Sequence, residues 1–465
     1  MNKTMAGASS QVSFPSTAPA LGAERPVAWP RRTMRTLANG MQVVLAEQRT
    51  FPKIGVELLF RSGNALVAHR SPGLAEMTAR VVRAGTQSRT NRQIEEDLRG
   101  MGASLGTTAG ADTSAISISG LSEFAEPLLA MVADLARNAA FPAEEFERER
   151  RERLEELRVD RSTPGFIAEE RFRRVLFGEH PYAVIAPTDS QVESYTRDAL
   201  ADFYRENYVP SNALLLAVGD FAADRMMDLI EKTLGAWKAN DAPLFAGAAP
   251  PAAHGRKVHV VHMPGAVQAE VLVGNLAINR QSPDWRRALL ANTIYGGAFN
   301  SRLVANIREQ KGYTYSPRSG FHPFRHQGYF SVHAAVRSEV VAATLTEVFY
   351  EMDRMRALPV AEAELDAARN YLCGVFSLGI ATQGGLLGQL STQYLDRLPE
   401  DYLETFREHI RMLQITDVLV AARKYFDSAN ASIVVVGDRA QVGPQAVLFG
   451  DVKVWDTHGH ELAGS

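Results

Sequence analysis

An internal repeat is the feature that most limits how this chain can fold. The segment NALLLAVGD at 212–220 recurs as NASIVVVGD at 430–438, an offset of 218 (430 − 212). Upstream, the segment that begins SPGL at 71–86 corresponds to the one that begins SPDW at 282–297, an offset of 211 (282 − 71). Both pairs occur in the same order along the chain, which indicates a duplicated unit rather than a chance match.

A third match supports the same interpretation. The pattern of a helix before Gly102 returns before Gly312, an offset of 210 (312 − 102). Three collinear matches with slowly drifting offsets are what duplication followed by loop changes produces. We therefore predict two homologous α+β units, at 31–240 and 255–450, of the α/β-roll type.

The hydrophobic pattern of the first unit predicts both strands and helices. Short apolar runs, bounded by turn residues, predict strands, and longer runs with a period near 3.6 predict helices. Each unit should therefore form a mainly antiparallel sheet that helices cover on one face. The predicted strands are 41–46, 54–60, 115–119 and 213–218, and the predicted helices are 71–84, 92–99, 124–138, 142–159 and 198–208.

Three segments are expected to lie outside the two units. Residues 1–30 are rich in Ala, Ser and Pro and predict a mobile tail without an intact signal peptide. Residues 241–254, rich in Ala and Pro, predict a linker. Residues 451–465 are expected to form a second tail. No stretch reaches the ~18 uninterrupted apolar residues that a membrane span needs.

The overall composition excludes some classes of function. The chain has 465 residues, with 50 Lys and Arg against 53 Asp and Glu, for a net charge of −3. This balance gives no electrostatic reason to expect nucleic acid as a partner. The one cysteine, Cys373, cannot form a disulfide within the chain. The sequence is therefore compatible with a soluble protein of either the cytoplasm or the periplasm, and leaves the compartment open.

The segment GGAFNSRLVANIREQKGYTYSPRSG at 296–320 carries the clearest chemical pattern. A helix is expected from about residue 300 to a stop at Gly312, followed by a strand with a period of two at 313–316. Arg308 would then lie seven positions before Tyr315 (315 − 308), at a helix–strand junction. Both side chains can donate hydrogen bonds to a carbonyl or a developing oxyanion. Alternatively, Arg308 complements the helix dipole and Tyr315 packs in a core.

Several of these motifs together resemble the M16 (pitrilysin-like) metallopeptidase family. They are the duplicated unit, HPY at 180–182, the two strands that end in Val-Gly-Asp, and SRLVANIREQKGYTYSP at 301–317. The resemblance extends over nearly all of 35–450 and is strongest to the bacterial short-subunit branch, which is related to mitochondrial processing peptidase subunits and respiratory-complex core proteins. It implies that two such chains pair as the halves of a clamshell that encloses an unfolded peptide.

The resemblance also implies where a zinc site would lie, and the sequence departs from it there. Active family members carry H-x-x-E-H on a helix of the first unit and a further glutamate downstream. Anchored on the Gly-Thr that follows the helix, the motif falls on Glu76, Ala79 and Arg80, and the downstream ligand on Glu156. Arg80 has no lone pair to offer a metal, and Ala79 supplies no general base. We expect no metal in this chain, and we expect Glu76 and Glu156 to be ordinary surface or interdomain carboxylates.

The non-zinc half of such a pair contributes an arginine and a tyrosine. The resemblance implies that Arg308 and Tyr315 form this catalytic pair. Arg302 and Tyr313 are nearby alternatives and accessory substrate contacts, and the glycine pair, Gly296 and Gly297, belongs to the same substrate-binding segment.

The sequence thus predicts a zinc-free subunit of a heteromeric M16-type metalloendopeptidase, inactive when isolated. A homologous H-x-x-E-H subunit would supply the zinc, and the ligand would be an unfolded peptide. The main alternative is a scaffold or peptide-binding protein without catalysis, similar to the core proteins. A third alternative is an independent peptidase with a different metal site.

Overall fold

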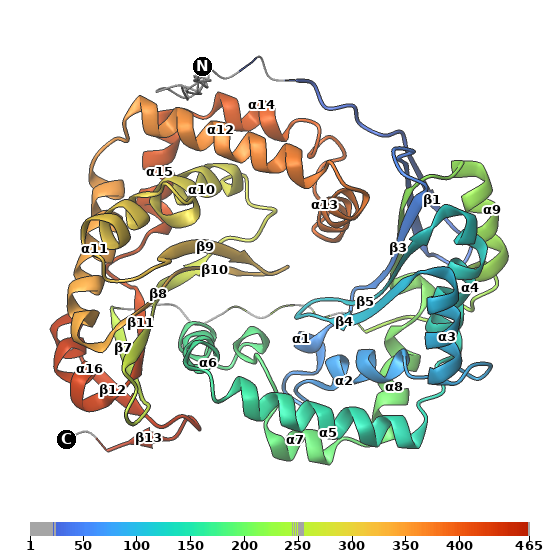
Figure 1. Ribbon diagram of the computed structural model, residues 1–465, viewed down its shortest axis with the longest axis horizontal. Helices are drawn as coiled ribbons and strands as arrows, with labels where there is room; N and C mark the ends of the chain where they lie inside the picture. The colour runs from blue at the N-terminus through green and yellow to red at the C-terminus, as the bar shows by residue number, and fades with distance from the viewer. Residues whose placement is uncertain are drawn as a thin grey trace, which may run out of the picture.

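Two β-sheets form the framework of the chain, one in each half (Figure 1). This computed structural model describes Gly22 and residues 25–243, 245, 247, 249 and 255–463. The predicted linker at 241–254 therefore lies mostly outside the described residues. Its described residue Phe245 packs its ring 5.8 Å from that of Tyr182.

The first sheet has six strands in the order β1-β2-β6-β3-β5-β4. All neighbours are antiparallel except β2 and β6, which are parallel. The strands are β1 (Arg32–Thr36), β2 (Gln42–Glu47), β3 (Lys53–Phe60), β4 (Ser104–Ala109), β5 (Ser114–Leu121) and β6 (Ala213–Gly219).

The second sheet repeats this plan and confirms the predicted duplication. Its order is β13-β12-β7-β11-β8-β10-β9, and β7 pairs in parallel with β11 as β2 does with β6. The antiparallel pairs β11–β8, β8–β10 and β10–β9 likewise match β6–β3, β3–β5 and β5–β4. The strands are β7 (Lys257–His262), β8 (Gln268–Ala277), β9 (Arg318–Pro323), β10 (Gly328–Arg337), β11 (Ser432–Gly437), β12 (Val452–Trp455) and β13 (Glu461–Leu462).

The structure differs from the predicted tail at 451–465. Strand β12 pairs in parallel with β7, and β13 pairs with β12, so the second sheet continues past residue 450. Trp455 of β12 donates from its indole nitrogen to Nδ1 of His259 at 2.9 Å, and the guanidinium of Arg171 stacks 3.6 Å from the indole ring. Within the predicted N-terminal tail, the described Trp29 packs against the ring of Phe376 at 6.2 Å.

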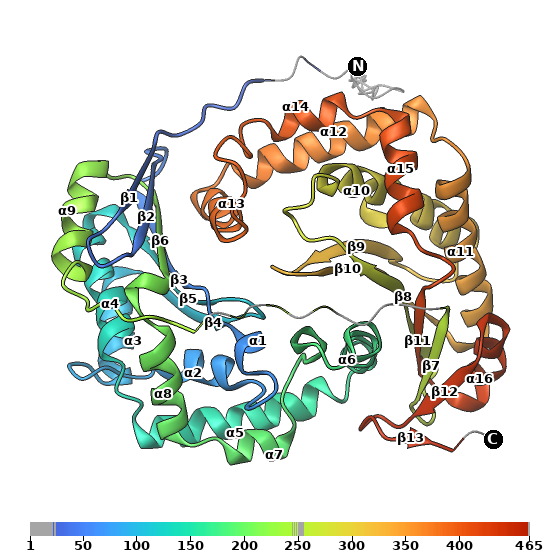
Figure 2. The ribbon, with the colours of Figure 1, turned by 180° about the vertical axis from the view of Figure 1, so that it is seen from behind.

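Helices surround each sheet (Figures 1 and 2). In the first half they are α1 (Asn64–Val67), α2 (Leu74–Val82), α3 (Asn91–Met101), α4 (Ala125–Asn138), α5 (Ala143–Asp160), α6 (Pro164–Phe177), α7 (Asp189–Ser194), α8 (Arg197–Asn207) and α9 (Ala223–Leu234). In the second half they are α10 (Trp285–Asn292), α11 (Val341–Ala357), α12 (Glu362–Gly379), α13 (Gln383–Leu395), α14 (Phe406–Met412), α15 (Ile415–Tyr425) and α16 (Arg439–Ala446).

Shorter helical segments connect these elements. Two are π-helices, η4 (Thr293–Gly297) and η5 (Val304–Gln310). The 3₁₀ turns are η1 (Ser122–Phe124), η2 (Pro181–Ala183), η3 (Pro210–Asn212), η6 (Ser338–Val340) and η7 (Val447–Phe449).

Local sequence signals explain the boundaries of helix α3. Helix α3 starts with a capping box, in which the side chain of Thr90 accepts from the amide of Gln93 and the side chain of Gln93 accepts from the amide of Thr90. It ends at Gly102, whose φ of 57° is the left-handed conformation that glycine adopts without strain. Such signals were sufficient to place the helix to within two residues.

One helix of each half packs on the sheet of the other half. Helix α6 packs on β8 and β11 of the second sheet, and α13 packs on β3 and β6 of the first sheet (Figures 1 and 2). Phe172 and Phe177 of α6 share a core cluster with Val434 of β11, and Leu390 of α13 shares one with Leu216 of β6. Every residue of β6 and β11 is buried, because helices cover both faces of the two strands.

Among the described residues no single helix is long and apolar enough to cross a membrane. Helices α12 and α13 meet the length and hydropathy criteria only as a pair, and they are bent by 109° at the break between them.

Candidate functional site

Arg308 lies between two exposed aromatic rings. Its guanidinium carbon is 4.6 Å from the centroid of the Tyr315 ring and 4.9 Å from that of Phe299. The Tyr315 side chain is 80 % exposed and that of Phe299 is 72 % exposed. Arg308 also forms an ion pair with the exposed Glu309 at 3.2 Å. Cation–π contacts at exposed positions contribute only about 0.5–1 kcal/mol each, so this arrangement leaves the guanidinium and the phenol available to a ligand.

The backbone that carries this pair differs from the prediction. The helix that contains Arg308 is the π-helix η5, a form found mostly at single turns and often at functional sites. Residues 313–316 are not a strand, because β9 begins only at Arg318. Pro317 has no N–H to donate to a ladder, and the hydroxyl of Thr314 donates to Ala335 O at 2.5 Å across the adjacent strand instead.

The two tyrosines of the segment consequently point in different directions. Tyr313 is partly buried against the core of the second unit, whereas Tyr315 projects into solvent. The alternation predicted from Tyr-Thr-Tyr-Ser had placed both side chains on one face, and that prediction was wrong. Of the two tyrosines, Tyr315 is the one whose ring contacts an arginine.

Arg302 is held by a neighbouring helix. Its guanidinium donates from Nε and Nη2 to the two carboxylate oxygens of Glu364 on α12, both at 2.8 Å. Hydrogen bonding to Arg302 outweighs burial and lowers the pKa of Glu364. Glu364 also accepts from the amide of Ala361 and so caps α12. Because Arg302 is engaged in this bidentate pair, Arg308 is the more accessible of the two guanidinium groups.

The glycine pair sets the close packing of the loop before Arg302. A Cβ on Gly296 would lie 2.4 Å from the hydroxyl of Ser319 and 2.7 Å from a methyl of Leu303. A Cβ on Gly297 would lie 2.5 Å from the side-chain amide of Asn292. These distances are shorter than any real carbon contact, so both positions require glycine for packing.

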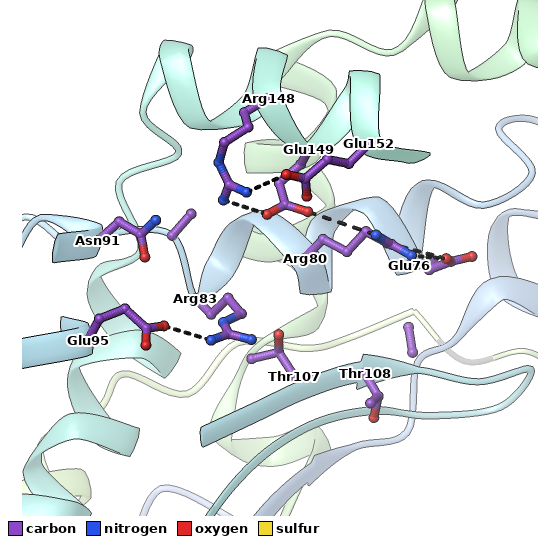
Figure 3. A pocket seen from close by; sticks show the side chains of 12 residues that line it. Glu76, Arg80, Arg83, Asn91, Glu95, Thr107, Thr108, Arg148, Glu149 and Glu152 are labelled. Carbon is purple, nitrogen blue, oxygen red and sulfur yellow. Dashed lines mark hydrogen bonds and ion pairs between the residues drawn. The ribbon is translucent and has the colours of Figure 1, made fainter. Parts of the chain in front are cut away.

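In the first unit, Arg80 and carboxylates from two helices meet at the predicted degenerate zinc position (Figure 3). The guanidinium of Arg80 on α2 donates to Oε1 of Glu156 on α5 at 3.1 Å and is 3.3 Å from Oε1 of Glu76. Glu149 lies 3.9 Å from Arg80, and Arg153 lies 3.2 Å from Glu76.

Electrostatic contacts stabilise this cluster as it stands. Burial alone would lower the pKa of Arg80, but the hydrogen bond to Glu156 and the charges of Glu76 and Glu149 raise it above its usual value. At Glu156, burial alone would raise the pKa, but the hydrogen bonds and charges of Arg80 and Arg153 lower it below its usual value. The buried Glu149 differs, since burial raises its pKa despite the neighbouring guanidinium groups.

These residues do not fit a zinc ion. A guanidinium has five N–H donors and no lone pair, so Arg80 cannot be a ligand. Ala79 is buried and offers neither a ligand nor a base. In the part of the chain that the structure describes, no group of three or more His, Cys, Asp and Glu side chains can hold a metal ion. The positive charge among these carboxylates comes from Arg80 and Arg153.

A polar pocket of about 650 Å³ adjoins the cluster (Figure 3). Its walls include Arg148 and Glu149 of α5 and the residues Thr107, Thr108 and Ala109 of β4. Strand β4 is the edge of the first sheet, so its outer backbone groups are not paired within the sheet.

Sequence reasoning missed Phe299, Glu149 and Arg153. A spacing signal existed for two of them, because Glu149, Arg153 and Glu156 recur at helical spacing on one face of α5. Phe299 gave no such signal, since it lies in an irregular loop between two π-helices.

The HPY motif has a structural role. The ring nitrogen Nδ1 of His180 accepts from the amide of Tyr182 at 3.0 Å, and the Tyr182 hydroxyl donates to Asp112 at 2.6 Å. Asp112 in turn accepts from the amide of Arg325 in the turn between β9 and β10. The motif therefore joins the two halves at their contact.

Comparisons with known proteins support the family resemblance. Residues 42–183 match the family model described as insulinase (peptidase family M16), and residues 194–372 match the one described as peptidase M16 inactive domain. An uncharacterized zinc protease of Rickettsia bellii is 23 % identical over 410 residues, which are 86 % of this chain and 96 % of that protein.

Solved structures share the fold. The peptidase M16 inactive domain from Pseudomonas fluorescens has a TM-score of 0.80 at 27 % identity, and the alignment covers 88 % of this chain and 98 % of that one. A protease from Helicobacter pylori has a TM-score of 0.82 at 20 % identity, with 88 % and 99 % of the two chains covered.

Proposed function

Because this chain belongs to the M16 peptidase family, we propose that it is the zinc-free subunit of a two-subunit M16 metalloendopeptidase. A homologous partner with an intact H-x-x-E-H motif supplies the zinc. This chain supplies Arg308 and Tyr315 as donors to the substrate and one half of the wall around the bound peptide.

One observation carries the proposal: the two candidate sites of the chain have diverged in opposite ways. At the degenerate zinc position, Arg80 pairs with Glu76 and Glu156, and no metal ligand set remains among the described residues. In the second unit, Arg308 and Tyr315 lie side by side near the surface. A chain with no metal ligand set at one position, and with a partly exposed guanidinium beside an exposed tyrosine at the other, suits the substrate-holding half of a pair.

The chemistry of the two donors fits a peptide carbonyl. The Arg308 guanidinium is cationic at any physiological pH, and hydrogen bonds from an ionised donor are about twice as strong as neutral ones. The Tyr315 hydroxyl donates a second, neutral hydrogen bond. Two donors aimed at one oxygen hold the carbonyl in place and stabilise the negative charge that develops on it during attack by water. The partner's zinc supplies the activated water.

Reconstitution tests the proposal. The chain is co-expressed with the H-x-x-E-H homologue encoded in the same genome, and cleavage of a quenched fluorescent peptide is followed for the pair and for each chain alone. We expect activity from the pair and none from this chain alone. A stable complex that binds peptides but cleaves none would instead favour the scaffold or peptide-binding alternative.

A further inference from the structure

The two halves place equivalent helices at equivalent positions. Helix α5 starts at residue 143 and α12 at 362, an offset of 219 (362 − 143). The next helices, α6 and α13, start at 164 and 383, again an offset of 219 (383 − 164). Both α5 and α12 have 18 residues. Each residue of α5 therefore has a counterpart on α12, 219 positions later.

This correspondence links the polar pocket beside Arg80 to a second, apolar cavity. Arg148 and Glu149 line the polar pocket, and their counterparts Ala367 and Ala368 line a cavity of about 240 Å³ in the second unit. The opposite wall of this cavity includes Ile294 and Ala298. Duplicated units thus carry cavities at matching places, one lined by charged side chains and the other largely by apolar ones.

The surface of α12 continues the apolar cavity along the helix. Tyr371, Val375 and Leu378 follow Ala367 at helical spacing and are 40 %, 49 % and 74 % exposed. Gly374 lies on the same face, with nothing within 4 Å of where its Cβ would be. Val375 is the counterpart of Glu156 (156 + 219), so the face that carries carboxylates on α5 is apolar on α12.

The cavity also adjoins the Arg308 site. Ala298 and Asn300 line it, and Phe299, the residue between them, stacks on Arg308. A ligand on the α12 face can therefore reach the Arg308–Tyr315 pair without leaving the surface. We call the cavity and the exposed face from Ala363 to Leu378 the α12 surface.

We propose that the α12 surface binds an extended peptide segment through a bulky apolar side chain seated in the cavity. This inference rests on the proposed function and gives it a substrate class: peptides with an aromatic or large aliphatic residue near the bond held by Arg308 and Tyr315.

The size of the surface selects this occupant. Sixteen helical residues, from 363 to 378, span about 24 Å, and one helix is about 10 Å wide. This strip is far smaller than the roughly 800 Å² that each partner buries in a stable protein–protein interface. An extended peptide of about seven residues covers the same length. A cavity of about 150 Å³ is known to accept benzene, so the cavity of about 240 Å³ has room for an aromatic ring.

Peptide binding to the full chain tests the inference. A fluorescein-labelled ten-residue peptide with one Phe between two Leu residues is compared, by anisotropy, with a peptide in which these three are Ser. Ala367→Phe fills the cavity, and Val375→Gln with Leu378→Gln removes apolar area while retaining good helix formers. The matched controls are Ala440→Phe on α16 and Val420→Gln on α15, both at exposed helical positions.

We expect the apolar peptide to bind about tenfold more tightly than its serine analogue, and both α12 variants to abolish that difference while the controls retain it. Equal binding by wild type and α12 variants would overturn the inference. The proposed function would still stand if the reconstituted pair cleaved peptides, and would fall if the pair cleaved none.

A further measurement distinguishes a second copy of the chain as the occupant. Sedimentation velocity is recorded for the wild type and the Val375→Gln/Leu378→Gln variant. We expect the same sedimentation coefficient for both. Self-association of the wild type that the variant loses would mean that copies of the chain cover this face, and would also overturn the inference.

Discussion

The guanidinium of Arg80 donates to the carboxylate of Glu156 from a helix 76 positions earlier in the chain. The family resemblance implies that both positions would hold zinc ligands in an active relative. Here Arg80 supplies the positive charge, and its guanidinium also forms ion pairs with Glu76 and Glu149. The contact between α2 and α5 that a metal ion would otherwise hold is therefore held by ion pairs.

Purified chain should contain no stoichiometric zinc, because a guanidinium cannot ligate a metal and occupies the centre of the acidic cluster. The measurement is metal analysis by mass spectrometry after dialysis against a weak chelator. About one tightly bound zinc per chain would contradict this prediction and favour an independent metal site.

Replacing Arg80 by alanine should destabilise the chain. The change removes the cation that Glu76, Glu149 and Glu156 share, and leaves Arg153 and Arg148 as their remaining partners. Breaking a fully buried pair costs about 3–5 kcal/mol. Arg80 and Glu156 are partly exposed, so we expect about 1–2 kcal/mol. Thermal unfolding measures the loss, with Arg92→Ala as the control because that exposed side chain forms only one i,i+4 pair. Equal loss in both variants would show that the cluster has no special role.

Duplication made it predictable that the two units share one plan, but not that a helix of each half packs on the sheet of the other half. The prediction placed helices on one face of each sheet, whereas every residue of β6 and β11 is buried, with helices on both faces. Nothing in the sequence of α6 or α13 identifies the sheet that its apolar face meets, because that depends on contacts far apart in the chain. The same limit applies to β12, whose four residues pair with β7 almost 200 positions earlier.

The candidate site was predictable only in part, for similarly local reasons. The pattern around Arg308 indicated a helix before Gly312, and the structure has a helix there, although of the π form. Four alternating residues at 313–316 were too few to establish a strand, and Pro317 interrupts the pairing. The π-helical geometry and the stacking of Phe299 on Arg308 arise from tertiary contacts that single-residue propensities do not contain.

Removing the buried ring of Phe172 should destabilise both halves together. This side chain of α6 packs in the core of the second sheet, and deletion of a buried Phe typically costs about 3–5 kcal/mol. Since α6 belongs to the first half, we expect calorimetry to show one transition in the wild type and the same single transition at lower temperature in Phe172→Ala. The exposed Phe51→Ala serves as the control. Two separate transitions, only one of them shifted, would show that the exchanged helices do not couple the halves.

The stability of the chain should fall in mild acid because of His259. Burial, together with the charges of Arg171 and Lys453, lowers the pKa of His259 to about 4. An unfolded histidine titrates near ~6.5, so between these values the unfolded chain binds the additional proton. Stability is therefore complete above about pH 6.5 and declines as the pH falls towards 4, by up to about 1.4 kcal/mol per pH unit for this group.

The control for the pH effect is His259→Phe, which preserves an aromatic ring beside Trp455 and cannot titrate. Urea unfolding at pH 7.5, 6, 5 and 4.5 should show a shallower pH dependence for this variant than for the wild type. Identical slopes would mean that His259 is not the responsible group.

Arg308 and Tyr315 should matter for turnover by the reconstituted pair and little for folding. Tyr315→Phe removes one hydroxyl from an exposed ring and preserves the stacking on Arg308, so we expect unchanged thermal unfolding. Loss of one oxyanion donor typically lowers kcat by about 10²–10³. Arg308→Ala also removes the aliphatic stem and the contact with Phe299, so a small loss of stability should accompany its loss of rate. The matched control is Arg337→Ala, an exposed arginine of the second unit paired only with Glu339. If both site variants fold normally and retain full turnover, Arg308 and Tyr315 have no role in substrate binding. Tyr313→Phe and Arg302→Lys then test the alternative residues. Because Arg302 makes a bidentate contact with Glu364, we expect Arg302→Lys to lower stability rather than turnover.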